Sequence, residues 1–287
     1  MKKGRQIGKI WGSAVTILLL MISLTAATYA WFTVNRVVST DKVDARSGTE
    51  ELELQVSATG GNGFRGSGEA AIVQVNSTDR TALMPVSTAD LKTFVYSPGT
   101  VDGNASSFRQ VTGEQYYYHG RVYIRARAQG QKNGSRMALY LDQSSDAGGA
   151  LASTASGQLL NAARLGLTFD NGNPVIFSLS DKGNVSSDQV RNTVIGGTKL
   201  GDNMVLTGTG GTIRQTKDPS VSLNTCTIQM NGDNIVLPDK PLIYMELGKI
   251  YTLDIYFYLE GCDPDCSNSI SYDGADLHLA FYGILDE

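Results

Sequence analysis

The residues best suited to chemistry lie in one short segment near the C-terminus, Asp263-Pro264-Asp265-Cys266-Ser267-Asn268. Asp263, Asp265 and Asn268 offer alternate side-chain oxygens, which are the ligands that calcium prefers in proteins. No glutamate follows at the twelfth position of the loop, and an Asp-Pro-Asp sequence is also ordinary turn chemistry. The segment therefore predicts a structural turn, with a weak calcium site as the alternative, and we expect no other cofactor.

Two of the three cysteines, Cys262 and Cys266, flank this turn, and the third is Cys226. Three cysteines are too few to build a disulfide scaffold, so the stability of the fold must come from packing. Cys262 and Cys266 are close enough in sequence to bridge outside the cell, which leaves Cys226 as the odd thiol. Geometry decides whether this candidate disulfide forms, and the sequence does not give that geometry.

The chain has only two histidines, His119 and His278, which lie far apart on different predicted strands. Neither a His-Glu zinc motif nor a nearby His-based nucleophile pair can be written with them, which removes the common hydrolase designs. The Gly208-Thr209-Gly210-Gly211 run lacks the Lys-Ser/Thr that follows a phosphate-binding loop. We therefore expect a protein that is not an enzyme, with both histidines as partly exposed strand residues.

A tyrosine and arginine face runs along the segment 116–127, which holds Tyr123, Arg121, Arg125 and Arg127. Such a face could bind nucleic acid, but the region after residue 30 has 20 basic against 28 acidic residues, a net charge of about −8. That balance argues against nucleic acid, because phosphate neutralisation supplies most of the affinity. A subunit or polymer contact is one alternative, and a plain solvent-facing sheet surface is the other.

Period-two alternation of apolar and polar residues is clearest in three segments, 121–128, 249–260 and 275–282. Alternation of this kind puts every second side chain on a buried face. The segments are also rich in the β-branched and aromatic residues that strands favour. The inward positions, which we expect to form the core, are Val122, Ile124, Ala126, Leu253, Ile255, Phe257, Leu277, Leu279 and Phe281.

Clusters of glycine and asparagine separate many short predicted strands, as tight turns require. The predicted fold class is therefore all-β, a single antiparallel, jelly-roll-like β-sandwich over residues 51–287. Beyond an N-terminal hydrophobic helix, we expect at most one short helix, within 150–164, because serine, threonine and glycine interrupt its apolar side. The least patterned region, 193–216, is predicted to be a long mobile loop or insertion.

The first 30 residues have the charge order of an export signal, with four basic residues before an uncharged stretch over 10–35. Small residues precede Trp31, so the preferred cleavage site lies between Ala30 and Trp31, and Ala27 is the alternative. The apolar core is shorter than a stable transmembrane helix prefers. A removable signal is therefore the first interpretation, and retention of residues 1–30 as a membrane anchor is the second. Either way we expect a secreted or cell-surface protein.

Residues 31–50 form an N-terminal extension that is too polar for a core helix. Phe32, Val34, Val37 and Val43 nevertheless give it enough aromatic and β-branched character to pair along a sheet edge. We predict that this extension is a donor strand for a neighbouring subunit, which would create an open, head-to-tail polymer. The alternative is that it pairs within its own subunit or stays disordered.

Three segments carry a resemblance to a known family: ATYAWFTVN at 27–35, DARSGTEELEL at 44–54 and LEGCDPDCSN at 259–268. The first two resemble the opening of the TasA and camelysin group of exported proteins of Gram-positive bacteria (Firmicutes). The third is similar to a segment of surface proteins with the same opening, whose function is not established. The resemblance covers about a tenth of the chain.

The resemblance implies a jelly-roll-like sandwich, maturation by a dedicated signal peptidase and, in the TasA branch, polymerisation into extracellular biofilm fibres. Camelysin is classed as a metalloprotease, but this sequence has no zinc motif, so a metalloprotease is the least favoured of three alternatives. The expected function is a structural subunit of a surface or matrix fibre that associates with itself. A membrane-anchored surface domain that binds a ligand or polymer is the alternative.

Overall fold

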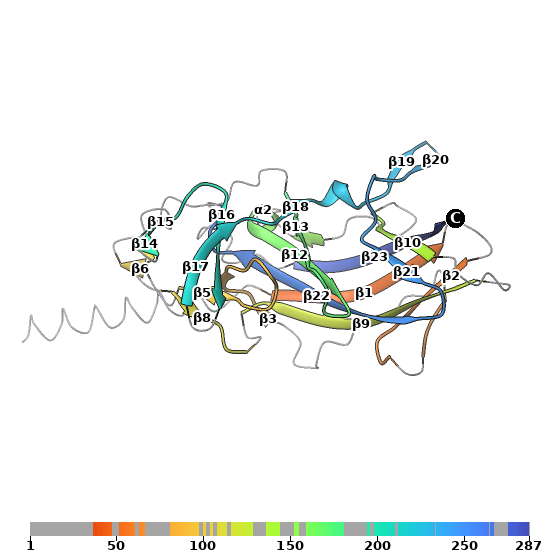
Figure 1. Ribbon diagram of the computed structural model, residues 1–287, viewed down its shortest axis with the longest axis horizontal. Helices are drawn as coiled ribbons and strands as arrows, with labels where there is room; N and C mark the ends of the chain where they lie inside the picture. Colours follow the sequence, from red (N-terminus) through yellow and green to blue (C-terminus); the bar gives the residue numbers. More distant parts are fainter. Residues whose placement is uncertain are drawn as a thin grey trace, which may run out of the picture.

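The computed structural model describes most of the region after residue 36, and its arrangement is shown in Figure 1. The described residues are 37–47, 52–60, 63–66, 81–97, 100–101, 104–105, 108–113, 116–128, 136–143, 152–154, 159–180, 194–195, 198–209, 212–232, 234–263, 265–266 and 275–286. They are almost entirely strands and turns, so the predicted all-β class is confirmed. Within these ranges, no helix is long and apolar enough to cross a membrane.

One of the two large sheets has six strands, in the order β21-β10-β23-β1-β3, with β11 also paired to β23. The strands of this six-stranded sheet are β1 (Val37–Ser47), β3 (Thr81–Ala82), β10 (Arg136–Leu141), β11 (Ala152–Thr154), β21 (Ile243–Glu246) and β23 (Ala275–Asp286). Most neighbours are antiparallel, but β1 and β23 run parallel. The strand nearest the N-terminus therefore enters the sheet beside the strand nearest the C-terminus.

The other large sheet has seven strands, in the order β18-β13-β12-β22-β9-β2, with β4 also paired to β22. The strands of this seven-stranded sheet are β2 (Leu52–Ser57), β4 (Pro85–Val86), β9 (Tyr118–Ala128), β12 (Ala163–Phe169), β13 (Val175–Ser178), β18 (Val221–Ser222) and β22 (Ile250–Glu260). β22 pairs with β12 at seven positions and with β9 at eight, and both neighbours are antiparallel to it. The longest alternating segment of the sequence is thus a central strand.

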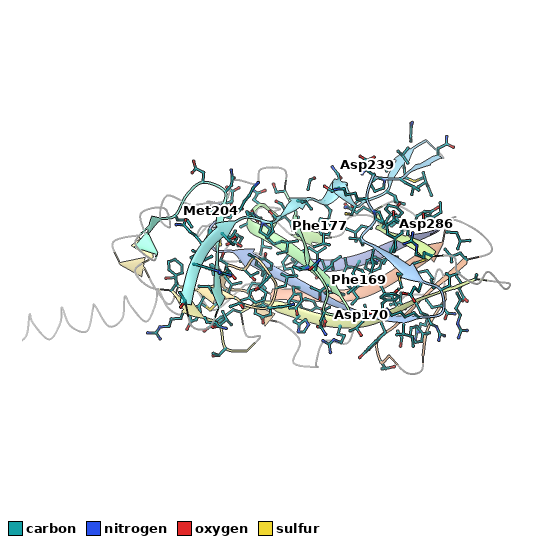
Figure 2. The ribbon with its side chains drawn as sticks, in the orientation of Figure 1. Phe169, Asp170, Phe177, Met204, Asp239 and Asp286 are labelled. Atoms are coloured by element: carbon teal, nitrogen blue, oxygen red, sulfur yellow. The ribbon has the colours of Figure 1, made fainter. Side chains whose placement is uncertain are left out.

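Five two-stranded sheets and two short helices complete the described structure. The two-stranded sheets are β5 (Val95–Tyr96) with β8 (Arg109–Gln110), β6 (Thr100–Val101) with β7 (Asn104–Ala105), β14 (Val194–Ile195) with β15 (Thr198–Lys199), β16 (Met204–Thr209) with β17 (Thr212–Lys217), and β19 (Gln229–Asn231) with β20 (Asn234–Val236). The helices are α2 (Leu159–Ala162) and the 3-10 helix η2 (Leu223–Thr225). Met204 on β16 and Asp286 at the end of β23 lie toward opposite ends of the long axis (Figure 2).

All nine predicted core residues are buried, and each has an exposed fraction of 0%. They belong to one apolar cluster that also includes Leu52 and Leu54 of β2 and Met137 and Leu139 of β10. Because this cluster takes side chains from both large sheets, the two sheets share one core. Period-two alternation therefore identified both the strands and the faces that they bury.

Two local predictions have different outcomes. The one short helix predicted within 150–164 is present as Leu159–Ala162, while Ala152–Thr154 in the same range is the strand β11, which pairs with β23. The region 193–216 is not an unstructured loop, since it contains the hairpin β14–β15 and most of the hairpin β16–β17. Val205 and Leu206 explain the second case, because both are fully buried in a small apolar cluster.

The seven-stranded sheet is covered on its second face as well, near the C-terminal end of β22. Val86, Leu91 and Phe94 pack there with Tyr117, Ile176 and Tyr258 in a separate apolar cluster. The close approach depends on Gly166 of β12, where an added Cβ would lie 2.5 Å from a methyl carbon of Leu91. The polar face of β22 is therefore not a wet surface at this end, and Glu260 is only 1% exposed.

Candidate functional site

The predicted N-terminal sites fall partly outside the described residues. Ala30, Trp31, Phe32 and Val34 precede residue 37, where the description begins, so the cleavage and assembly predictions at these positions stay predictions. Val37 and Val43 lie on β1, whose backbone pairing is described. The backbone of β1 is therefore the part of the predicted assembly segment that can be analysed.

β1 has two very different neighbours. It pairs with β23 at nine positions, from Val38 beside Ala275 to Ser47 beside Gly283, with one irregularity in register after Thr40. On its other side, β3 pairs with it at only two positions. In the single chain, residues 37–47 of the extension thus adopt the intramolecular alternative, and their donation to a neighbouring subunit stays a prediction.

The predicted calcium loop has the hydrogen bonds of a turn at the two candidate ligands that are described. Asp263 Oδ2 accepts a hydrogen bond from the Arg164 guanidinium at 2.7 Å, and Asp263 Oδ1 accepts one from the Asp265 amide at 2.9 Å. Asn268 lies outside the described residues. In the part of the chain that the structure covers, no group of three or more His, Cys, Asp or Glu side chains could hold a metal ion.

Cys262 is a free, buried thiol, so the structure does not contain the candidate disulfide with Cys266. Its Sγ atom instead donates a hydrogen bond to Ser87 Oγ at 3.6 Å. Burial is the main reason that the pKa of this thiol lies well above its ordinary value. A buried, protonated thiol is a poor nucleophile, so Cys262 has a structural rather than a catalytic environment.

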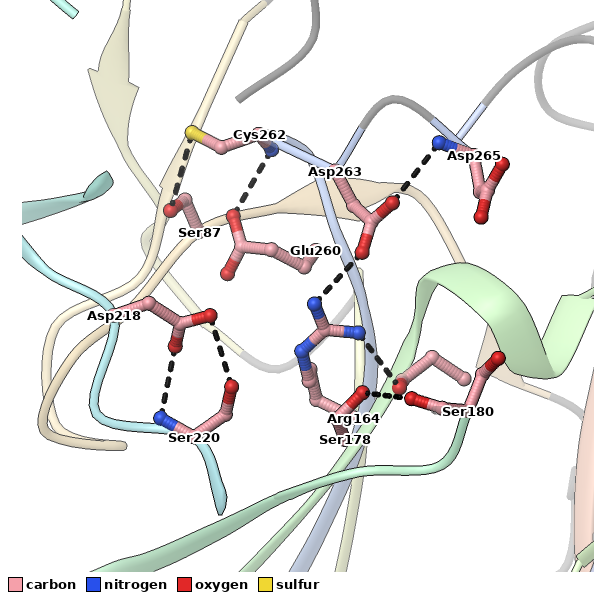
Figure 3. Close-up of polar contacts among 11 residues, drawn as sticks. Ser87, Arg164, Ser178, Ser180, Asp218, Ser220, Glu260, Cys262, Asp263 and Asp265 are labelled. Carbon is pink, nitrogen blue, oxygen red and sulfur yellow. Dashed lines mark hydrogen bonds and ion pairs between the residues drawn. The ribbon is translucent and has the colours of Figure 1, made fainter. Parts of the chain in front are cut away.

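Three ionisable side chains meet at the C-terminal end of β22 and form what we call the polar cluster: Arg164, Glu260 and Asp263 (Figure 3). Arg164 comes from the start of β12, Glu260 ends β22, and Asp263 lies in the following turn. Each is 1% exposed. Besides its bond to Asp263, Arg164 donates to the Ala163 carbonyl at 3.1 Å, while its buried Nε atom has no hydrogen-bond partner among the described residues.

One buried cation thus faces two buried carboxyl groups, and burial has the largest effect on the pKa of each carboxyl. Burial raises the pKa of Glu260 to about 8, although Ser87, Arg164 and the Cys262 amide each oppose the shift. Burial also raises the pKa of Asp263, against the attraction of Arg164. Glu260 is therefore largely protonated at neutral pH, which spares the cluster a second buried negative charge.

Ser87 joins this cluster to two other elements. Its Oγ atom accepts a hydrogen bond from the Leu206 amide of β16 at 2.8 Å, and its hydroxyl lowers the pKa of the Glu260 side chain. The backbone of Ser87 pairs with Val95 through hydrogen bonds of 2.8 and 2.9 Å. Together with the Cys262 thiol, these contacts connect β5, β16 and the end of β22 at one buried residue.

A second polar group lies on the same face of β22, closer to its middle. The Asp254 carboxylate, which is 1% exposed, accepts hydrogen bonds from Arg121 at 2.7 and 3.1 Å, and its Oδ1 lies 2.9 Å from His119 Nε2. Burial opposes ionisation, but His119 and Arg121 outweigh it and lower the pKa of Asp254. The His119 ring also stacks on Tyr256 at 4.5 Å. These contacts fix the strand pair β9–β22.

Comparison with known proteins found no matching family model, no matching curated protein and no matching solved structure. The chemistry of the site must therefore be judged from its own geometry. Ser87, Arg164 and Glu260 could not be identified from the sequence, because their side chains meet only in the folded chain. One signal was present: Glu260 continues the polar positions of β22 directly beside the Cys262–Cys266 segment.

Proposed function

We propose that this chain is a secreted or cell-surface structural protein that associates with itself by exchanging strand β1 between subunits. The observation that carries the proposal is the position of β1. This strand lies within the N-terminal extension and makes one long pairing, with β23, and one pairing of two positions, with β3. Because backbone ladders do not depend on which chain supplies the strand, β1 of a neighbour can make the same pairs.

Loss of β1 would favour the binding of another strand in its place beside β23. Without β1, the β23 edge would present unpaired backbone groups next to core residues such as Leu279 and Phe281, which are fully buried here. An open edge of this kind is a ready template for another chain. A subunit that loses its own β1 is therefore stabilised by the β1 of a neighbour, and repetition of this contact gives a filament when the rotation does not close.

The finer architecture belongs to the same proposal. We infer that the two large sheets form a jelly-roll-like sandwich, which their shared core cluster supports. We also propose that residues 1–30 act as an export signal and that cleavage after Ala30 leaves a free N-terminus six residues before β1. Removal of the signal would then permit the exchange of β1 only after export.

Deletion tests the proposed function. The mature chain from Trp31 to Glu287 should form fibres in negative-stain microscopy, whereas the same chain without 31–44 should stay folded and monomeric. A synthetic peptide of residues 31–47 should bind the truncated chain, and the same peptide with Val43→Pro should bind much more weakly, because proline interrupts a central ladder. Val43→Thr is the matched control peptide, since threonine keeps the amide and the β-branched shape.

Polymerisation of the truncated chain, or a mature chain that never assembles, would contradict strand exchange. In the second case, intact-mass analysis of the protein from cells adds information. Retention of residues 1–30 without assembly would favour the membrane-anchored surface domain instead.

A further inference from the structure

The short strand that borders β1 is connected directly to the polar cluster. β3 pairs with Val37 and Val38 at the start of β1, and the chain then runs through β4 to Ser87. We call residues 81–87 the bordering segment. Because β3 is the only described strand on this side of β1, the position of the bordering segment decides whether the start of β1 is enclosed.

The bordering segment is fixed to the rest of the molecule at its C-terminal end. β4 pairs with β22 at Leu259 and Glu260, and the Gly261 amide donates to the Val86 carbonyl at 2.8 Å. Within the segment, Leu83 and Val86 are each 1% exposed, and the Met84 amide donates to the Tyr116 carbonyl at 3.0 Å. With apolar anchors and backbone bonds distributed along it, the segment is expected to move as one unit.

Ser87 is the one side chain at the end of this segment that reaches several elements at once. A hydroxyl group has one donor and two acceptor positions. At Ser87 the Leu206 amide and the Cys262 thiol donate to the hydroxyl oxygen, and the hydroxyl also lowers the pKa of Glu260. Ser87 is 3% exposed, so water cannot readily replace these bonds. Loss of the hydroxyl would leave several buried polar groups without their partner.

We propose that Ser87 is a latch: its hydroxyl holds the bordering segment against β22, and opening of this latch frees the start of β1 for exchange between subunits. The first half concerns the single chain alone, whereas the second half rests on the proposed function. The latch gives the exchange a control point that lies far from β1 in sequence. It also assigns a role to the polar cluster, which keeps the end of β22 in the position that Ser87 requires.

Ser87→Ala tests the latch in monomeric protein. Hydrogen exchange of the β1 amides, residues 37–47, should accelerate roughly tenfold or more, the size expected when a buried hydrogen-bond partner is removed. The amides of β9, residues 118–128, should keep their protection, because they report global opening. Ser222→Ala is the matched control, since Ser222 lies on an exposed strand and should leave both segments unchanged.

Ser87→Cys tests the same latch in the opposite direction. Because Ser87 Oγ lies 3.6 Å from Cys262 Sγ, a cysteine at position 87 puts a second sulfur within reach of that thiol. Oxidation should form an 87–262 disulfide, verified by peptide mass, and should slow the exchange of residues 37–47 below the wild-type rate. Reduction should restore the wild-type rate, and the Ser87→Cys, Cys262→Ser double variant should not respond to oxidant.

The latch is wrong if residues 37–47 exchange at the wild-type rate in Ser87→Ala, or if the oxidised Ser87→Cys protein exchanges them as fast as the reduced form. The comparison of oxidised with reduced Ser87→Cys protein remains decisive even when Ser87→Ala lowers the stability of the whole chain. Assembly is scored separately with mature protein. Faster exchange of β1 without any fibre formation would keep the latch and refute self-association through β1, so the two failures are distinguishable.

Discussion

β22 and β1 are both eleven-residue strands, yet their surroundings differ completely. β22 lies between two antiparallel neighbours, with seven pairs on one side and eight on the other, and it is buried on both faces near its end. β1 has nine pairs with β23 and two with β3. Pairing within this molecule is therefore uneven: β22 has a long ladder on each side, whereas β1 has one long ladder, and for this reason we propose β1 as the exchanged strand.

The largest effect is expected in the core beside β22. Phe257→Ala removes a fully buried aromatic ring and should lower the free energy of unfolding by roughly 3–5 kcal/mol. Ile250→Ala on the same strand is the control, because Ile250 is 42% exposed and its truncation should cost far less. Chemical denaturation measures both. Equal effects at the two positions would mean that the buried face of β22 is wrongly assigned.

The buried ion pair comes next. Arg164→Met leaves the Asp263 carboxylate buried without its cation and should cost about 3 kcal/mol. Arg136→Met breaks an exposed pair with Asp286 and should cost no more than about 1 kcal/mol. A comparison of the two variants by urea denaturation isolates the effect of burial. Similar losses would show that the polar cluster is more hydrated than its 1% exposure indicates.

Because Glu260 is protonated in the folded chain, the free energy of unfolding should change with pH by a few kcal/mol. Its pKa is about 8 in the folded chain and near its ordinary value of 4.5 in the unfolded chain, so the folded state holds the extra proton. Stability from this group is therefore fully present below pH 4.5 and is lost as the pH rises to about 8. Denaturation midpoints at pH 6 and pH 8.5 should differ in wild type.

Glu260→Gln should remove that pH difference, because the amide cannot ionise. Glu246→Gln, at an exposed position of β21, serves as the control and should keep the wild-type pH dependence. If the Glu260→Gln protein loses stability between the two pH values as steeply as wild type, the pH dependence comes from a group other than Glu260.

The smallest effect is expected from divalent cations. Because both oxygens of the Asp263 carboxylate already accept hydrogen bonds, millimolar calcium or EDTA should shift the melting temperature by less than about 1 °C. Asp265→Asn should not change this response. A calcium-dependent increase of several degrees that Asp265→Asn abolishes would support the calcium alternative.

Much of the fold could be predicted from local patterns. The inward faces of β9, β22 and β23 all follow from alternation in the sequence. These predictions succeed because alternation with period two is a property of each strand by itself. The short segment Ala152–Thr154 has no such pattern, and it is a strand only because β23 offers it a partner.

The polar cluster could not be predicted because its parts come from distant positions. Arg164 and Asp263 are 99 residues apart, and Ser87 and Leu206 are 119 residues apart. The residue types of the 260–268 segment predicted a turn or a weak calcium site for its carboxylates. Residues such as Leu91 and Phe94 also cover the other face of β22. The alternation within β22 could not predict this cover, because it depends on residues elsewhere in the chain.

A cross-link between β1 and β23 tests strand exchange most directly. Asp44 on β1 is the partner of Ala280 on β23, so Asp44→Cys and Ala280→Cys place two thiols beside each other across this ladder. The two substitutions are introduced into separate mature chains, one of them isotopically labelled, and the mixed chains are assembled and oxidised. Both substitutions in one chain provide the control for the register.

Strand exchange predicts a disulfide between residues 44 and 280 that joins a labelled to an unlabelled chain and that is enriched in the fibre fraction. If the control chain forms the link within itself while the mixed fibres contain no link between chains, β1 stays in its own subunit and strand exchange is wrong.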